Sequence, residues 1–224
     1  MEESLKLFTF WQSGSSFRVR IALNLKSLAY ESIFIRGGRG STDLRSSEYL
    51  ALNPQGVIPT LVDRGRVFTQ SMAIIEYLEE TYPKSPLLPG GAADRAWVRS
   101  LAQIIVSDTH PLITARVIDH LNDPLKLDNN VQKTWVCFWI ERGLRAFEEL
   151  LKADKRSDPY CYGAAPTLAD MCLVPQVYTA MRYGCDLSHL PMVEKIYRHC
   201  MEHSAFQCAA PENQPDSPDR HVSK

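Results

Sequence analysis

The sequence lacks the features that mark several large classes of protein. No apolar run approaches the roughly 18 residues that a membrane-spanning helix requires, and residues 1–4 lack the basic and apolar regions of a signal peptide. The 25 lysines and arginines are interspersed with 26 aspartates and glutamates, for a formal net charge of −1. No basic surface for nucleic acid is therefore indicated. We expect a soluble cytoplasmic protein with no membrane or nucleic-acid partner.

Cysteine is absent from the first half of the chain, and the six cysteines present form no Cys-x-x-Cys pair. They are Cys137, Cys161, Cys172, Cys185, Cys200 and Cys208. Their spacings suit neither a zinc site nor a disulfide scaffold, so we expect no metal site. Because a free cysteine usually packs as a small buried hydrophobe, we interpret all six as structural or incidental thiols. A reactive thiol is then expected to come from a cofactor.

Residues 1–83 alternate between strand-like and helix-like patterns, which is typical of a compact α/β domain. The predicted strands are residues 5–10, 30–35, 60–62 and 67–69. The predicted helices are residues 16–26, 44–52 and 71–82. The glycine-rich residues 37–43 are expected to form a flexible loop.

A proline- and glycine-rich linker, residues 84–91, ends the α/β pattern. Beyond it every periodic segment is helical, which predicts an all-α domain over residues 92–210. Its expected helices are residues 92–121, bent at Pro111, and residues 131–153, 167–183 and 192–204. Thr167 and Asp170 have the spacing of a capping box, whose role is in folding. Residues 211–224 are polar and proline-rich and are expected to form a loosely ordered tail.

Four small residues, Ser13, Gly14, Ser15 and Ser16, separate the first predicted strand from the first helix. A helix N-terminus carries amide donors without intrahelical acceptors and a positive dipole end, so it stabilises an anion. A thiolate bound there, with a serine hydroxyl donating to it, would have a lowered pKa. The alternative is that Ser15 or Ser16 simply caps the helix, as serine does routinely.

Two further junctions carry residues suited to a peptide-like ligand. Pro59 opens a predicted strand, where a cis peptide bond would turn the backbone N–H and C=O of Ile58 outward to pair with a ligand. The alternative is an ordinary proline at a strand edge. Gln70 and Ser71 begin a predicted helix, whose N-terminus can receive a carboxylate. Ser71 can equally be a cap and nothing more.

The helical half adds a group of polar residues that are candidates to face a cleft between the two halves. They are Asp108, Thr109, His110, Arg116 and Arg182. Arginine suits the binding of a dicarboxylate because its guanidinium forms bidentate hydrogen bonds. The alternative for each arginine is a solvent-facing side chain or a surface ion pair.

Four motifs together carry a resemblance to a known family: SGSSFRVRIAL at residues 13–23, ALNPQGVIPTL at 51–61, QSMAIIEYLEE at 70–80 and TLADMCLVPQV at 167–177. The Gln214-Pro215-Asp216 tail is similar as well. Over nearly its whole length the chain resembles the zeta-class glutathione transferases, which include the maleylacetoacetate and maleylpyruvate isomerases. The resemblance implies a thioredoxin-like, glutathione-binding N-terminal domain followed by an all-helical substrate-binding domain.

The resemblance also implies the residues of a site. Ser13 is expected to assist the glutathione thiolate, with Ser15 as a second catalytic hydroxyl. The expected glutathione-binding residues are Ser13, Gly14, Ser15, Ser16, Ile58, Pro59, Gln70, Ser71, His110 and Thr114. The expected substrate-binding residues are Arg116, Arg182 and Gln12.

The activity implied by the resemblance is the glutathione-dependent cis–trans isomerisation of a maleyl keto-diacid to its fumaryl isomer, by a homodimer, in the catabolism of aromatic compounds. The Ser-Gly-Ser-Ser form is nearer to the maleylpyruvate isomerases. Both branches usually carry arginine, a substrate contact, where this chain has Gln12. Two alternatives stay open: a general transferase or peroxidase acting on haloacids or other electrophiles, and a non-enzymatic glutathione-transferase-like binding protein.

Overall fold

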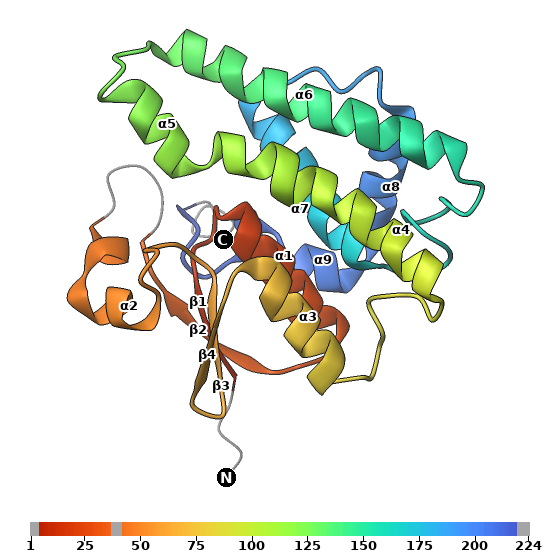
Figure 1. Cartoon of the computed structure of the whole chain (residues 1–224), viewed down its shortest axis with the longest axis horizontal. Helices are drawn as coiled ribbons and strands as arrows, with labels where there is room; N and C mark the ends of the chain where they lie inside the picture. The colour runs from red at the N-terminus through yellow and green to blue at the C-terminus, as the bar shows by residue number, and fades with distance from the viewer. Residues whose placement is uncertain (1–4, 37–41, 219–224) are drawn as a thin grey trace. The chain divides into compact units, whose positions relative to one another are not determined.

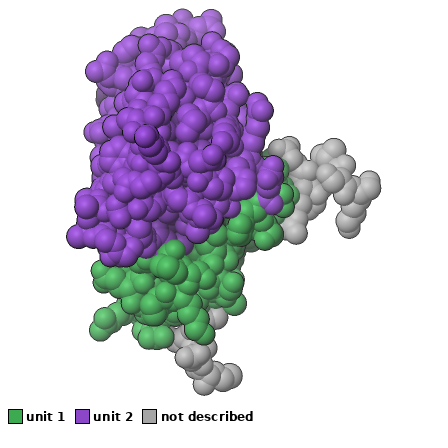
Figure 2. Space-filling model, turned by 90° about the vertical axis from the view of Figure 1, so that its right-hand side faces the viewer, with its two compact units in different colours: residues 1–86, 203–224 green, residues 87–202 purple. Residues whose placement is uncertain are grey.

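A computed structural model describes residues 5–36 and 42–218. The chain divides into two compact units, shown in different colours in Figure 2: unit 1 comprises residues 1–86 and 203–224, and unit 2 comprises residues 87–202. Residues 37–41 of the expected glycine-rich loop lie outside the described residues.

Unit 1 is built on a four-stranded sheet of order β2-β1-β3-β4. The strands are β1 (Leu5–Thr9), β2 (Tyr30–Phe34), β3 (Thr60–Asp63) and β4 (Arg66–Thr69). β1 and β2 are parallel because a helix connects them. β3 is antiparallel to both β1 and β4. The β3–β4 hairpin closes at Arg64 and Gly65, whose φ values of 49° and 72° suit a two-residue hairpin turn.

The helices of unit 1 follow the apolar spacing of the sequence, and Figure 1 shows them around the sheet. They are α1 (Gly14–Leu25), α2 (Ser47–Leu52) and α3 (Ser71–Thr81), with a 3₁₀ turn, η1 (Asp43–Arg45), before α2. α1 and α3 pack against each other, and the core between helices and sheet includes Leu7, Phe17, Ile21, Ile74 and Leu78, none more than 1% exposed. α1 begins at Gly14, two residues earlier than expected, because Ser13 caps it.

The end of the chain belongs to unit 1, which corrects two expectations. The helix expected over residues 192–204 stops at Glu202, and α9 (Ser204–Ala209) begins after His203, whose Nδ1 accepts the Ala205 amide at 3.1 Å. α9 packs on α1, and its Phe206 side chain is fully buried. A 3₁₀ turn, η4 (Pro211–Asn213), follows. The expected loose tail is therefore packed up to residue 218, with Gln214 buried.

Unit 2 contains only helices among its described residues. They are α4 (Ala92–Gln103), the π-helical stretch η2 (Ile104–Thr109), the 3₁₀ turn η3 (His110–Ile113), α5 (Ala115–Asn122), α6 (Asn129–Ala153), α7 (Leu168–Tyr183) and α8 (Pro191–Glu202). α6 runs its whole length as one helix in Figure 1. The capping box of α7 is confirmed, because Oδ2 of Asp170 accepts the Thr167 amide at 2.7 Å.

The single helix expected over residues 92–121 is wrong, because η2 and η3 interrupt it. Pro111 has no amide hydrogen to continue the helical ladder, and the hydroxyl of Thr109 donates to the Ile104 carbonyl at 2.8 Å. Gly143 of α6 lies against this interruption, since a Cβ there would overlap Oγ1 of Thr109. The departure from the α-helix thus occurs where α6 comes closest.

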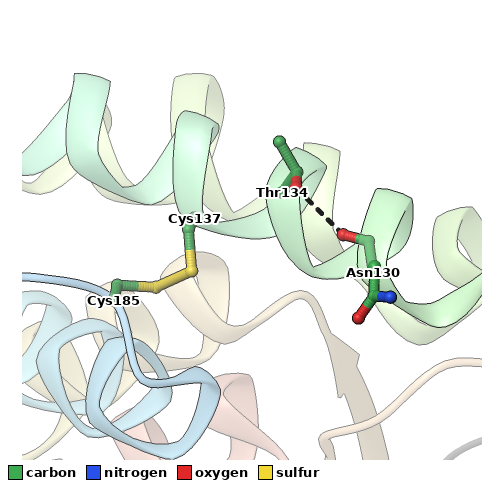
Figure 3. Close-up of a disulfide and its surroundings, with 4 residues drawn as sticks. All are labelled: Asn130, Thr134, Cys137 and Cys185. Atoms are coloured by element: carbon green, nitrogen blue, oxygen red, sulfur yellow. Dashed lines mark hydrogen bonds between the residues drawn. A yellow bond between two sulfur atoms is a disulfide. The ribbon is translucent and has the colours of Figure 1, made fainter.

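The cysteines differ from the expectation in one pair. Cys137, within α6, and Cys185, directly after α7, form a disulfide with their Cα atoms 5.3 Å apart, as Figure 3 shows. One turn earlier on α6, the Thr134 hydroxyl donates to the Asn130 carbonyl at 2.9 Å in the same view. A separation of 48 residues has no recognisable spacing, so only the packing of α6 beside the end of α7 reveals the pair. Cys161, Cys172 and Cys200 are buried as expected, whereas Cys208 is exposed.

Within residues 5–36 and 42–218, no helix combines the length and the apolar character needed to cross a membrane.

Candidate functional site

The start of α1 combines a helix cap with a possible anion site in one residue. Ser13 is the N-cap: its Oγ accepts the Ser16 amide at 3.1 Å and its carbonyl accepts the Phe17 amide at 2.9 Å. Accepting a hydrogen bond leaves the Ser13 hydroxyl proton available to donate. Gly14, the first helical residue, has an amide without an intrahelical acceptor. Ser13, rather than Ser15 or Ser16, is therefore the cap of α1, and the anion site at this helix start stays a prediction.

The neighbours of Ser13 differ in their access to a ligand. Gln12 and Ser15 are partly exposed on either side of Ser13 and Gly14. Ser16 is completely buried, and its amide is taken by Ser13. The Ser16 amide thus completes the cap, its buried hydroxyl has no hydrogen-bond partner within the described residues, and a ligand contact from Ser16 stays a prediction.

The bond between Ile58 and Pro59 is cis, which is the first of the two alternatives for this proline. The segment before it is held from the side: the carbonyl of Val57 accepts the Tyr49 hydroxyl at 2.6 Å and the Asn53 amide at 2.7 Å. Ile58 is half-buried and Pro59 is buried. The loop that presents the Ile58 backbone is thus fixed by side chains of α2 and of the residue after it.

Gln70 occupies the N-cap of α3 with φ +68° and ψ 116°, without a capping hydrogen bond from its side chain. A non-glycine residue in this region is strained, and such strain clusters at functional sites. Its side-chain amide is exposed and donates to Oε1 of Gln55. The expectation that Ser71 is the cap is therefore corrected: Ser71 is the first helical residue and is 8% exposed.

Arg18 is a residue of this region that the sequence reasoning missed. It lies in α1, is only 2% exposed, and its Nη1 donates to Oγ of Ser71 at 3.4 Å. A buried cation beside the N-terminus of α3 adds positive potential where a carboxylate is expected to bind. The sequence does contain a signal for this burial. Arg18 and Arg20 lie two positions apart in an apolar helix, so their side chains cannot both lie on one exposed face, and at least one of them is expected to be buried.

The register of the sheet brings these three junctions together at one end of the strands. Thr60, which follows Pro59, pairs with Phe8 of β1 and with Thr69 of β4. The chain leaves β1 toward Ser13, enters β3 from Pro59 and leaves β4 toward Gln70, all at the same end of three neighbouring strands. Residues separated by almost 60 positions thus meet because of antiparallel pairing.

The expected residues of unit 2 fall into two places. His110, partly exposed, begins η3, and the hydroxyl of Thr114 donates to the Pro111 carbonyl at 3.4 Å. Arg116 is exposed on the first turn of α5. Arg182 is exposed on the last turn of α7, with its guanidinium 5.1 Å from the centre of the Tyr183 ring. Consecutive short segments therefore group the first three residues, whereas Arg182 lies on a separate helix.

A mixed four-stranded sheet with a serine-capped helix start, a cis proline and a Gln-Ser junction at one end of three neighbouring strands has the arrangement of a thioredoxin-like domain. Residues 13–81 match the family model described as the N-terminal domain of glutathione S-transferase.

Similarity to individual proteins extends over both units. A maleylacetoacetate isomerase of Pseudomonas aeruginosa is 42% identical over 215 residues, covering 96% of this chain and 99% of the relative. The holo structure of a bacterial maleyl pyruvate isomerase of the zeta class is 43% identical, with a TM-score of 0.91 over 95% of this chain and 99% of that one. The maleylacetoacetate isomerase of Methylobacterium extorquens, crystallised with malonate and glutathione, is 38% identical, with a TM-score of 0.90 over 95% and 99%. The chain belongs to the zeta-class family of maleylacetoacetate and maleylpyruvate isomerases.

Proposed function

We propose that this protein catalyses the glutathione-dependent cis–trans isomerisation of a maleyl keto-diacid, maleylacetoacetate or maleylpyruvate, to its fumaryl isomer. The observation that carries the proposal is the start of α1, where the capping hydroxyl of Ser13 keeps a proton to donate beside the positive end of the helix. Relatives of both substrate names align with almost the full chain.

The residues at the sheet edge fit a glutathione molecule held as an extended peptide. The backbone of Ile58 would pair with its cysteinyl residue. Gln70 and Ser71, with the N-terminus of α3 and buried Arg18 behind them, would receive its γ-glutamyl carboxylate. Ser13 would then face the sulfur. Bound glutathione supplies a sulfur nucleophile for reversible addition to the cis double bond, which permits rotation about that bond.

The contribution of Ser13 can be sized. A hydrogen bond to a charged group contributes about 1.5–3 kcal/mol, which corresponds to about one to two pKa units. The pKa of a free thiol is about 8.5, so this shift lowers the pKa of the bound thiol to about neutral pH. Ser15, with its partly exposed side chain on the same turn, is the second proposed hydroxyl.

Unit 2 is proposed to supply the substrate-binding residues. Arg116 and Arg182 carry exposed guanidinium groups suited to carboxylates, which would also stabilise the negative charge that develops on the keto-diacid. His110 and Thr114 are proposed to extend the glutathione contacts from η3 and the residue before α5. These assignments rest on the family resemblance together with the exposure of the side chains.

Gln12 and the Ser-Gly-Ser-Ser run refine the substrate. The run resembles the maleylpyruvate isomerases and favours maleylpyruvate as the substrate, although a maleylpyruvate isomerase and a maleylacetoacetate isomerase are both 42% identical to this chain. Gln12 is proposed to contact a substrate carboxylate through its neutral amide, where an arginine would form a charged pair. The same substitution favours a second candidate function, a general glutathione transferase or peroxidase acting on haloacids or other electrophiles.

The assembly and location are proposed from the resemblance alone: a cytoplasmic homodimer acting in the catabolism of aromatic compounds.

Parallel assays with maleylpyruvate, maleylacetoacetate and a chloronitrobenzene, each with and without glutathione, test the proposal. Glutathione-dependent isomerisation supports it, and conjugation of the chloronitrobenzene without isomerisation supports the second candidate. Calorimetry of glutathione binding separates both from a non-enzymatic binding protein. No association at millimolar glutathione would overturn both enzymatic functions.

A further inference from the structure

Two side chains far apart in the sequence hold the backbone that leads into Ser13. The amide of Trp11 donates to Oδ2 of Asp216 at 2.9 Å. The carbonyl of Trp11 accepts Nη2 of Arg20 at 3.1 Å. Both backbone polar groups of Trp11, two residues before Ser13, are therefore fixed by side chains.

The guanidinium of Arg20 extends this contact to the neighbouring peptide groups. Its Nη1 donates to Oγ1 of Thr9 at 3.0 Å and to the carbonyl of Phe10 at 3.2 Å. The same Phe10 carbonyl accepts the amide of Ser13 at 3.1 Å. One side chain thus connects the end of β1, the turn and the residue that caps α1.

Arg20 is tied in turn to the end of the chain. Its Nε donates to the carbonyl of Ala209 at 2.9 Å, and the side chain is completely buried. Burial lowers the pKa of Arg20 to about 10, while Tyr30 and Asp216 raise it, so the group is charged at neutral pH.

We name residues 205–217 the C-terminal strap. The strap is braced internally, because Nε2 of Gln214 donates to the carbonyls of Cys208 and Ala210, each at 2.9 Å. It is also attached to α1, since Nδ2 of Asn24 donates to the Ala205 carbonyl at 3.0 Å. The strap therefore offers Asp216 on a fixed support rather than on a free chain end.

We propose that Asp216 and Arg20 are positioning residues that, through the backbone of Trp11, hold Ser13 and the first turn of α1 in the geometry that keeps bound glutathione ionised. The inference rests on the proposed function. A hydroxyl and helix amides stabilise an anion only when they are aimed at it, and a displacement of 1 Å at a reacting group reduces rates by about 100-fold. The orientation of these groups thus depends on the C-terminal strap, whose Asp216 lies 205 positions from Trp11 in the chain.

The test compares two variants that remove the same charge. Asp216→Asn keeps an oxygen that can accept the Trp11 amide, whereas Asp216→Leu has nearly the same shape and no acceptor. Because both lose one negative charge, the effect of the charge cancels in the comparison, and the acceptor for the Trp11 amide is the main difference that is left. We expect the pKa of the bound glutathione thiol, read from thiolate absorbance, to be about one unit higher in Asp216→Leu, a tenfold change in the ionisation constant.

Glu212→Leu is the matched control, because Glu212 is an exposed carboxylate on the same strap. It should leave the thiol pKa at the wild-type value. The same thiol pKa in Asp216→Leu and Asp216→Asn, or a lower one in Asp216→Leu, would overturn the proposal. A merely structural role for Asp216 would lower the melting temperature of Asp216→Leu without separating the two thiol pKa values.

A measurement on the unmodified protein keeps the inference testable if Asp216→Leu does not fold. The Trp11 amide should exchange its hydrogen with solvent as slowly as amides in the middle of α1. Fast exchange would show that Asp216 does not hold the Trp11 amide and would overturn the proposal. Failure of the wild type to bind glutathione would overturn the proposed function instead. The exchange measurement would still test the hydrogen bond between the Trp11 amide and Asp216.

Discussion

The starts of α1 and α3 are both proposed to bind parts of one ligand, yet they are built in opposite ways. At α1, Ser13 caps the helix with its own oxygen and retains a proton to donate. At α3, Gln70 adopts φ +68° without a side-chain cap, and the buried Arg18 reaches Ser71 from behind. The first end is suited to ionising a thiol, and the second to holding a carboxylate that is already charged.

Ser13→Ala is expected to have the largest effect. Losing the hydroxyl should raise the pKa of the bound glutathione thiol by about one to two units. At pH values below that pKa, kcat/KM should fall about 10- to 100-fold. Titration of thiolate absorbance and steady-state kinetics measure the two quantities.

Ser46→Ala is its matched control, since Oγ of Ser46 caps α2 by accepting the Tyr49 amide at 3.2 Å. Both variants lose a cap, worth about 1 kcal/mol, but only Ser13→Ala should move the thiol pKa. Equal thiol pKa values in the two variants would remove Ser13 from its role.

Gln70→Ala is expected to weaken glutathione binding about tenfold, because a charged ligand group loses a hydrogen bond worth about 1.5 kcal/mol, the low end of the usual range, at an exposed side chain. The thiol pKa should stay close to the wild-type value, since Gln70 acts at the other end of the ligand. Calorimetry measures the dissociation constant. A raised thiol pKa with unchanged affinity would contradict the assignment of thiol ionisation to the start of α1 and of carboxylate binding to the start of α3.

Ser71→Ala is expected to weaken binding by a smaller factor, about threefold to fivefold, because the helix N-terminus and Arg18 remain. The same calorimetric titration measures it. A loss larger than that of Gln70→Ala would reverse the order of the two residues at the start of α3.

Gln70→Gly should be more stable to urea than Gln70→Ala by about 1 kcal/mol. Strain of about 1–3 kcal/mol at a positive φ is relieved by glycine, and part of the gain is offset by the greater freedom of glycine in the unfolded chain. The two variants lose the same side-chain amide, so the comparison isolates the backbone. Identical unfolding midpoints and slopes would mean that α3 starts without strain.

Much of unit 1 could be read from residue spacing. The strand–helix order and the helix after Gln70 are confirmed, because apolar periodicity depends on near neighbours in the chain. The cis bond at Pro59 was only one of two alternatives that the residues left open. α1 begins two residues earlier than the apolar spacing indicates, because the cap is Ser13 and neither of the two candidates, Ser15 and Ser16. Boundaries of this kind depend on one hydrogen bond.

Two features of unit 2 could not be read from spacing. The disulfide between Cys137 and Cys185 requires α6 to lie beside the end of α7. The interruption at η2 occurs where Gly143 of α6 leaves no room for a side chain. Both are consequences of which helices pack together, and packing partners far apart in the sequence leave no periodic signal.

The pattern of apolar and turn residues was enough for the class of fold and for the starts of α1 and α3 to within about two residues, since both depend on interactions within a few positions. Only packing in three dimensions revealed how those starts are supported: Arg18 beneath Ser71, and Arg20 with Asp216 around Trp11. A buried charge is stable only where its partners converge on it. Such convergence joins residues up to 205 positions apart and is set by the folded chain as a whole.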